Sequence, residues 1–106
     1  MKTVKYHKLV RDRIPEIIEQ AGQACAWSVL PDGEYLEMLD EKLNEELAEY
    51  QEDKSMEELA DLLEVMRAVA LARGSSLEEI EEIRRRKAEQ RGGFEKKILL
   101  EEVTEP

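Results

Sequence analysis

Two long segments with a helical repeat of apolar residues, joined by a very short connection, constrain the fold of this chain most strongly. In residues 34–52, apolar residues recur every three or four positions, as on one face of an α-helix: Leu36, Leu39, Leu43, Leu47 and Tyr50. Residues 56–73 form a second such segment, and Gly74 follows as a stop signal. Because only residues 53–55 separate the two segments, we expect an antiparallel helical hairpin.

Two shorter helices and two extended segments complete the expected fold. Pro15 is suited to begin a helix to about Ala21, and Ser76 opens a capping box for a helix to about Gln90. The stretches around Trp27 and Ile98 read as short strands or extended pieces that could pair. The expected fold class is therefore all-α, a helical bundle with short extended segments near Trp27 and Ile98, in a single domain of residues 1–106.

The second long helix is apolar around about half of its circumference, at roughly 100° per residue. The residues concerned are Met56, Leu59, Leu62, Leu63, Val65, Met66, Val69 and Ala70. An ordinary surface helix has a narrower apolar stripe, so this helix needs neighbours on two sides. We therefore expect oligomerisation to complete the bundle, as a homodimer or a homotetramer, between which the sequence does not choose.

The overall composition excludes several classes of protein. With 16 Lys and Arg against 26 Asp and Glu, the formal net charge of −10 excludes a protein that binds a nucleic acid duplex by neutralising phosphates. No stretch approaches the roughly 18 apolar residues of a membrane span, and no signal-peptide run follows the first residues. The single cysteine, Cys25, and single histidine, His7, exclude a disulfide framework and Cys/His zinc sites. We expect a reducing, cytoplasmic location.

The charge is concentrated in the middle of the chain. Residues 34–83 hold four basic and 17 acidic side chains, whereas both ends are mildly basic. The acidic residues could be the solvated surface of helices. Alternatively, the carboxylates gather to hold cations, and Lys and Arg from the ends hold phosphate that the same cations bind.

Two acidic pairs favour the second interpretation. Glu46 and Glu49, and likewise Glu58 and Asp61, are three residues apart, so each pair lies on one side of its helix. An antiparallel hairpin would bring the two pairs together, with Glu46 and Glu58 at or near packed faces. Carboxylates that converge there repel unless a cation neutralises them, and Mg²⁺ prefers such oxygen ligands.

Each of these residues also has a purely structural interpretation. Ser55-Met56-Glu57-Glu58 is a capping box, so Glu58 could simply cap its own helix. Lys42 precedes Glu46 by four residues and could form a routine surface pair with it.

The acidic strings and both ends of the chain resemble a known family. Residues 45–49 (EELAE) and 58–61 (ELAD) match the EExxE…ExxD motif of the all-α nucleotide pyrophosphohydrolases. This MazG-like superfamily includes phosphoribosyl-ATP pyrophosphohydrolase. Residues 6–18 (YHKLVRDRIPEII) and 91–98 (RGGFEKKI) resemble a subgroup of short house-cleaning members, so the resemblance spans nearly the whole chain.

The resemblance implies an enzyme, a Mg²⁺-dependent hydrolase that converts a nucleoside triphosphate to the monophosphate and pyrophosphate, with non-canonical nucleotides as the substrates to be removed. Carried over by motif position, the ligands of Mg²⁺ would be Glu46, Glu49, Glu58 and Asp61, with Glu45 as an accessory carboxylate. The resemblance does not identify the general base, the number of metal ions, or the preferred base and sugar of the nucleotide.

The phosphates of such a substrate also need positive partners. The candidates for substrate binding are Lys8, Arg11, Lys42, Lys87 and Arg91. Lys87 belongs to a basic run, residues 84–87, near the C-terminal end of an acidic helix, where the helix dipole alone would favour positive charge. We assign no catalytic role to Cys25 or His7.

Two alternative functions stay open. One is phosphoribosyl-ATP pyrophosphohydrolase activity in histidine biosynthesis, although the terminal signatures fit the house-cleaning subgroup better. The other is a non-catalytic helical interaction module, whose acidic faces keep it in solution while its wide apolar arc binds a partner helix.

Overall fold

The chain folds into four α-helices in a computed structural model that describes residues 2–106. No strand occurs among those residues, so the all-α prediction is confirmed. The helices are α1 (Ile14–Gln20), α2 (Asp32–Asp53), α3 (Met56–Ala72) and α4 (Leu77–Arg91). Each boundary lies within about two residues of the sequence-based prediction, the usual uncertainty of a helix end.

Local signals at the helix ends explain these boundaries. The hydroxyls of Ser55 and Ser76 accept hydrogen bonds from the backbone N–H of Glu58 and Glu79, which cap the N-termini of α3 and α4. Helix α2 ends at Asp53, and the left-handed φ of 57° at the next residue, Lys54, turns the chain sharply toward α3. A single turn therefore joins the two long helices.

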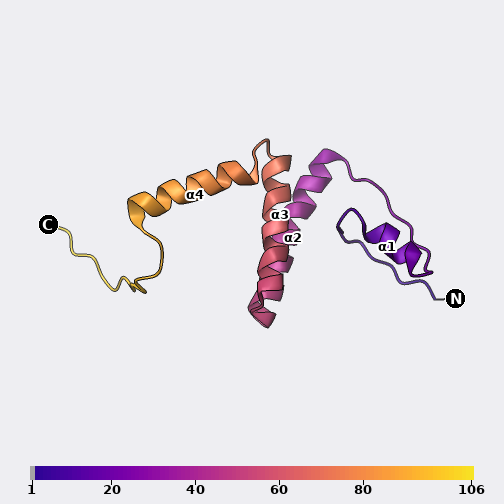
Figure 1. Ribbon diagram of the computed structural model, residues 1–106, viewed down its shortest axis with the longest axis horizontal. Coiled ribbons are helices and arrows are strands. Elements are labelled where there is room, and N and C mark those ends of the chain that lie inside the picture. Colours follow the sequence, from indigo (N-terminus) through magenta and orange to yellow (C-terminus); the bar gives the residue numbers. More distant parts are fainter. Residues whose placement is uncertain (1) are drawn as a thin grey trace.

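Helices α2 and α3 pack side by side as an antiparallel hairpin at the centre of the molecule (Figure 1). Leu39 on α2 and Ala70 on α3 are the most buried apolar residues, at 3% and 5% exposure. An ion pair of 3.0 Å between Arg73 and Asp40 joins the helices at the end of the hairpin away from the turn. The small core thus lies between α2 and α3.

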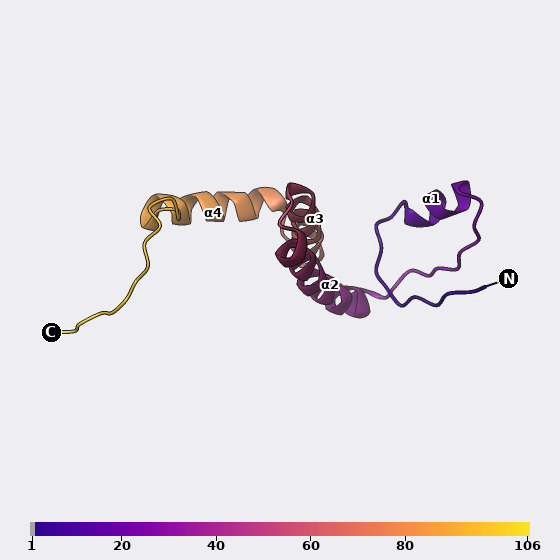
Figure 2. The ribbon, with the colours of Figure 1, turned by 90° about the horizontal axis from the view of Figure 1, so that it is seen from below.

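The rest of the chain extends away from this hairpin in opposite directions (Figures 1 and 2). Helix α4 touches only the end of α3, and α1 packs against no other helix. The segments around Trp27 and Ile98 lie on opposite sides of the hairpin and are neither strands nor paired. Their expected pairing is wrong because α4 carries the Ile98 segment far from the Trp27 segment.

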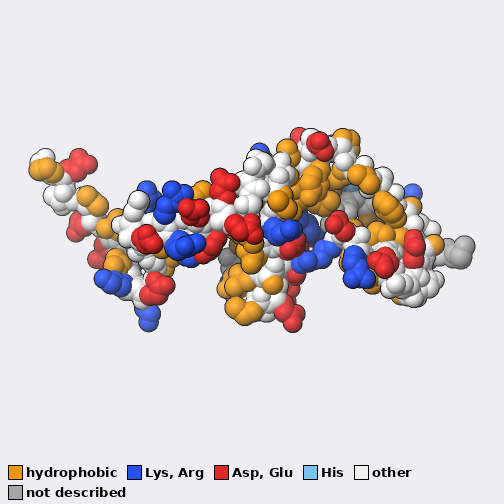
Figure 3. All heavy atoms as spheres, turned by 45° about the horizontal axis from the view of Figure 1, so that its top comes forward, with side chains coloured by type: hydrophobic (Ala, Val, Ile, Leu, Met, Phe, Trp, Pro, Cys, Tyr) orange, Lys and Arg blue, Asp and Glu red, His pale blue; other side chains and the backbone are white. Residues whose placement is uncertain are grey.

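Many apolar side chains remain on the surface. On α3, Met56 and Leu63 are 69% and 48% exposed, and Ile98, Leu99 and Leu100 after α4 are exposed as well. A space-filling view shows such side chains in several areas over the hairpin and its flanks (Figure 3). Within residues 2–106, none of the helices combines the length and the apolar character that crossing a bilayer requires.

Candidate metal centre

Five carboxylates from α2 and α3 form two overlapping groups near the hairpin turn. One group is Glu46, Glu58 and Asp61, and the other is Glu45, Glu46 and Glu49. Within each group, one carboxylate oxygen per residue lies within 4.8 Å of the others. The four residues predicted as metal ligands are therefore brought together, and Glu46 belongs to both groups.

We call these five residues the carboxylate cluster, and Glu46 is its most unusual member. It is only 7% exposed, and it is the one charged residue among the most buried side chains of the described chain. Its Oε1 lies 3.5 Å from Lys42 Nζ, whereas its Oε2 is buried without a hydrogen-bond partner. A buried carboxylate oxygen without a partner is costly in a folded protein.

Glu58 reaches the cluster from the first turn of α3. Its backbone N–H donates to the Ser55 hydroxyl at 3.2 Å, so half of the expected capping box is present. Its side chain, however, has Oε2 buried without a hydrogen-bond partner. The cap therefore fixes the start of α3, and the Glu58 carboxylate is left facing the other acids.

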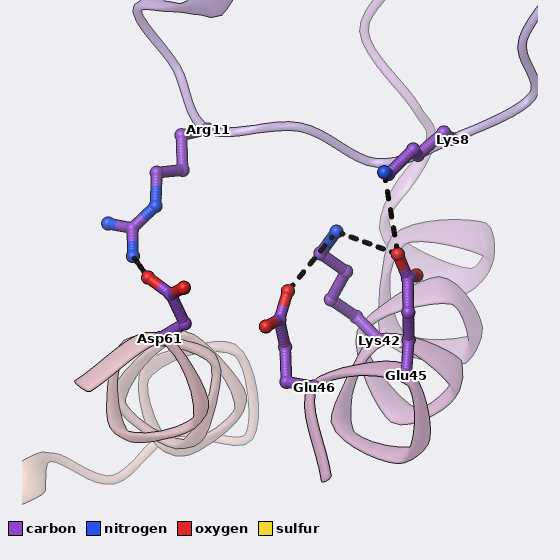
Figure 4. Close-up of polar contacts among 6 residues, drawn as sticks. All are labelled: Lys8, Arg11, Lys42, Glu45, Glu46 and Asp61. Atoms are coloured by element: carbon purple, nitrogen blue, oxygen red, sulfur yellow. Dashed lines mark hydrogen bonds and ion pairs between the residues drawn. The ribbon is translucent and has the colours of Figure 1, made fainter. Parts of the chain in front are cut away.

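Three basic side chains surround the cluster (Figure 4). Lys42 lies 3.5 Å from both Glu45 and Glu46, and Lys8 lies 3.5 Å from Glu45. The guanidinium of Arg11 donates to Asp61 at 2.7 Å. Three of the five predicted substrate-binding residues are thus beside the carboxylates.

The other two predicted substrate-binding residues lie elsewhere. Lys87 and Arg91 are in the second half of α4, which points away from the hairpin, and both are exposed (Figure 1). Within one copy of the chain, the structure therefore does not bring them to the cluster.

The donor set of the cluster fits a hard divalent cation. An octahedral Mg²⁺ shell is about 4.2 Å across and a Ca²⁺ shell about 5 Å, so oxygens spaced as in each group can share an ion after small side-chain rotations. Five carboxylates face three basic side chains, which leaves two negative charges uncompensated. Among the described residues, no ion pair involves Glu49 or Glu58.

Burial and mutual repulsion raise the pKa of both inward-facing glutamates. For Glu46 the main cause is burial, followed by the neighbouring Glu49, while Lys42 opposes the shift. For Glu58 burial again comes first, followed by the charges of Glu49, Asp61 and Asp53. The acidic motifs do not contain Asp53, and its position in the last turn of α2, beside the connection to α3, is the signal that could have identified it.

Comparison with known proteins leaves the family open. An uncharacterized protein of Mycolicibacterium smegmatis is 52% identical over 42 residues, which cover 40% of this chain and 43% of that protein. The match thus spans less than half of either chain. No protein-family model and no solved structure matches the chain. The resemblance to the MazG-like pyrophosphohydrolases stays a prediction.

The raised pKa of Glu46 predicts how stability depends on pH without metal. A carboxyl group that holds its proton more tightly in the folded state stabilises the fold at low pH, and this advantage is lost as pH rises from about 4.5 through the raised pKa. In EDTA at neutral pH, Glu46→Gln should therefore be more stable than wild type, by roughly 1–3 kcal/mol. The difference should shrink toward pH 4.5, as measured by urea unfolding.

The exposed neighbour of Glu58 provides the control for this measurement. Glu57→Gln removes a carboxylate from the same hairpin, but from a side chain at the surface. It should leave the free energy of unfolding nearly unchanged at each pH. Equal stabilities of Glu46→Gln and wild type across the pH range would contradict the electrostatic cost assigned to Glu46.

Proposed function

We propose that this chain is a Mg²⁺-dependent nucleoside triphosphate pyrophosphohydrolase of the MazG-like type, acting on non-canonical nucleotides in the cytoplasm. The observation that carries the proposal is the convergence of Glu46, Glu58 and Asp61, two of them with a buried, unpartnered oxygen. Bringing these carboxylates together costs free energy in the absence of a cation, and a divalent cation bound between them would make the arrangement favourable. The matching EExxE…ExxD spacing supports the choice of reaction.

In this reaction, water attacks phosphorus and the bond to the pyrophosphate leaving group breaks, which yields a nucleoside monophosphate. Bound Mg²⁺ would neutralise the acids and polarise the phosphate oxygens. Glu46, Glu49, Glu58 and Asp61 would hold the ion, and a carboxylate of the cluster takes the proton of the attacking water. Lys8, Arg11 and Lys42 lie at the edge of the cluster, and in this proposal they would pair with phosphate oxygens.

The half-buried thiol of Cys25 fits the cytoplasmic location. Its sulfur lies near the Pro15 carbonyl and a carboxylate oxygen of Glu19, at 3.8 and 3.9 Å. A free thiol in such a position persists most readily in a reducing compartment.

Pyrophosphate release from a nucleotide panel tests this function. Wild type with Mg²⁺ should release pyrophosphate from at least one canonical or damaged nucleoside triphosphate, and EDTA should abolish release. Glu58→Gln should lower kcat by at least about a hundredfold, because it removes one ligand charge from the ion. Glu57→Gln, one position away and exposed, should keep wild-type activity.

The same panel separates the alternatives. Turnover of phosphoribosyl-ATP in preference to every nucleoside triphosphate would favour the histidine-biosynthesis enzyme. No turnover of any nucleotide, together with unchanged partner binding after all four ligand acids are neutralised, would favour the interaction module instead.

An assembly that completes the helical bundle is part of the proposal, and we infer a homodimer or homotetramer. The radius of gyration of 19.1 Å is well above the value of about 13 Å typical of a compact chain of this length. A groove where α3 meets α4 is lined by Leu63, Leu77 and Arg85, among others. Exposed apolar residues on α3 and after α4 supply further surface that a second copy could cover.

Light scattering coupled to size exclusion tests the assembly. Wild type should elute as a dimer or tetramer, and the double variant Leu59→Lys/Leu63→Lys should shift toward monomer, because charges would enter an apolar interface. The control is Val29→Lys, which places a charge on an apolar residue before α2 that is more exposed than either leucine. A wild-type monomer at every concentration would contradict the inferred assembly.

A further inference from the structure

The segment Lys8–Arg11, which we call the N-terminal strap, crosses the carboxylate cluster without being part of a helix (Figure 4). Lys8 pairs with Glu45 on α2, and Arg11 pairs with Asp61 on α3. The helix that follows the strap, α1, packs against none of the other three helices. The two ion pairs are therefore the main polar attachments of the strap to the hairpin.

Asp61 has two competing roles in this arrangement. Its Oδ1 accepts a 2.7 Å hydrogen bond from Arg11, and the same residue completes the group with Glu46 and Glu58. Glu46 is itself a member of this group, and one of its carboxylate oxygens is buried without a hydrogen-bond partner. A divalent cation among these three acids would lie close to the guanidinium, and the two positive charges would repel each other.

We propose that Arg11 and a divalent cation exchange at Asp61, so that metal loading releases the N-terminal strap. This inference rests on the proposed metal site and adds a conformational consequence to it. In the metal-free chain, Arg11 supplies part of the missing positive charge and holds the strap across the cluster. Once the cation takes Asp61, Arg11 is free, and its planar donors are suited to a phosphate group at the same edge.

Calorimetric titration with Mg²⁺ measures the first consequence. Arg11→Gln should bind Mg²⁺ about two- to fivefold more tightly than wild type, the range expected from losing one partly exposed ion pair that competes with the metal. The control is Arg13→Gln, since Arg13 pairs with Glu16 in α1 and does not contact the cluster. Its affinity should match that of wild type.

Cleavage by trypsin after Lys8 measures release of the strap directly. Because coupling is reciprocal, a cation that competes with Arg11 must also weaken docking of the strap. Mg²⁺ should therefore speed this cleavage in wild type, whereas in Arg11→Gln cleavage should be fast with or without Mg²⁺. Cleavage after Lys97, in the exposed segment beyond α4, controls for effects on the protease.

The outcomes separate the inference from the function on which it rests. Tighter binding by Arg11→Gln together with Mg²⁺-dependent cleavage in wild type supports the exchange. Equal or weaker Mg²⁺ binding by Arg11→Gln, or cleavage after Lys8 that ignores Mg²⁺, overturns the exchange while the metal site stands. No Mg²⁺ binding by wild type, Arg11→Gln or Arg13→Gln overturns both.

Discussion

Burial of the Glu46 carboxylate between α2 and α3 is the constraint around which the carboxylate cluster is organised. The hairpin has a small core, and a charged side chain takes up part of the contact surface between its helices. A leucine at this position would strengthen the hairpin, because apolar burial stabilises and an unpartnered carboxylate oxygen does not. The chain thus gives up stability where its acids converge, which is typical of a functional site rather than a structural one.

The short connection between α2 and α3 turns local spacing into a three-dimensional site. Glu46 and Glu49 lie near the end of α2, and Glu58 and Asp61 lie near the start of α3, so an antiparallel turn places all four at one level. The left-handed Lys54 and the Ser55 cap fix that turn. The N-terminal strap then adds positive charge from a distant part of the sequence.

Periodicity and capping signals predicted the four helices and the four converging acids well, because these features depend on neighbours in the sequence. The contact of Arg11 with Asp61 joins residues fifty positions apart, and no local pattern specifies such a partner. The predicted pairing of the Trp27 and Ile98 segments was wrong for the same reason, because apolar character alone does not determine which surface a segment contacts. Lys87 and Arg91 were likewise predicted from their charge alone, and the structure places them on α4, away from the carboxylate cluster.

The central claim is that a divalent cation stabilises the converging acids. The most direct test of this claim is to locate a bound ion. Crystals grown with Mn²⁺, a substitute for Mg²⁺ with a strong anomalous signal, would reveal the ion by its anomalous difference density. The account predicts a peak at coordination distance from Glu46, Glu58 and Asp61. Well-ordered carboxylates without a peak between them, at saturating Mn²⁺, would contradict it.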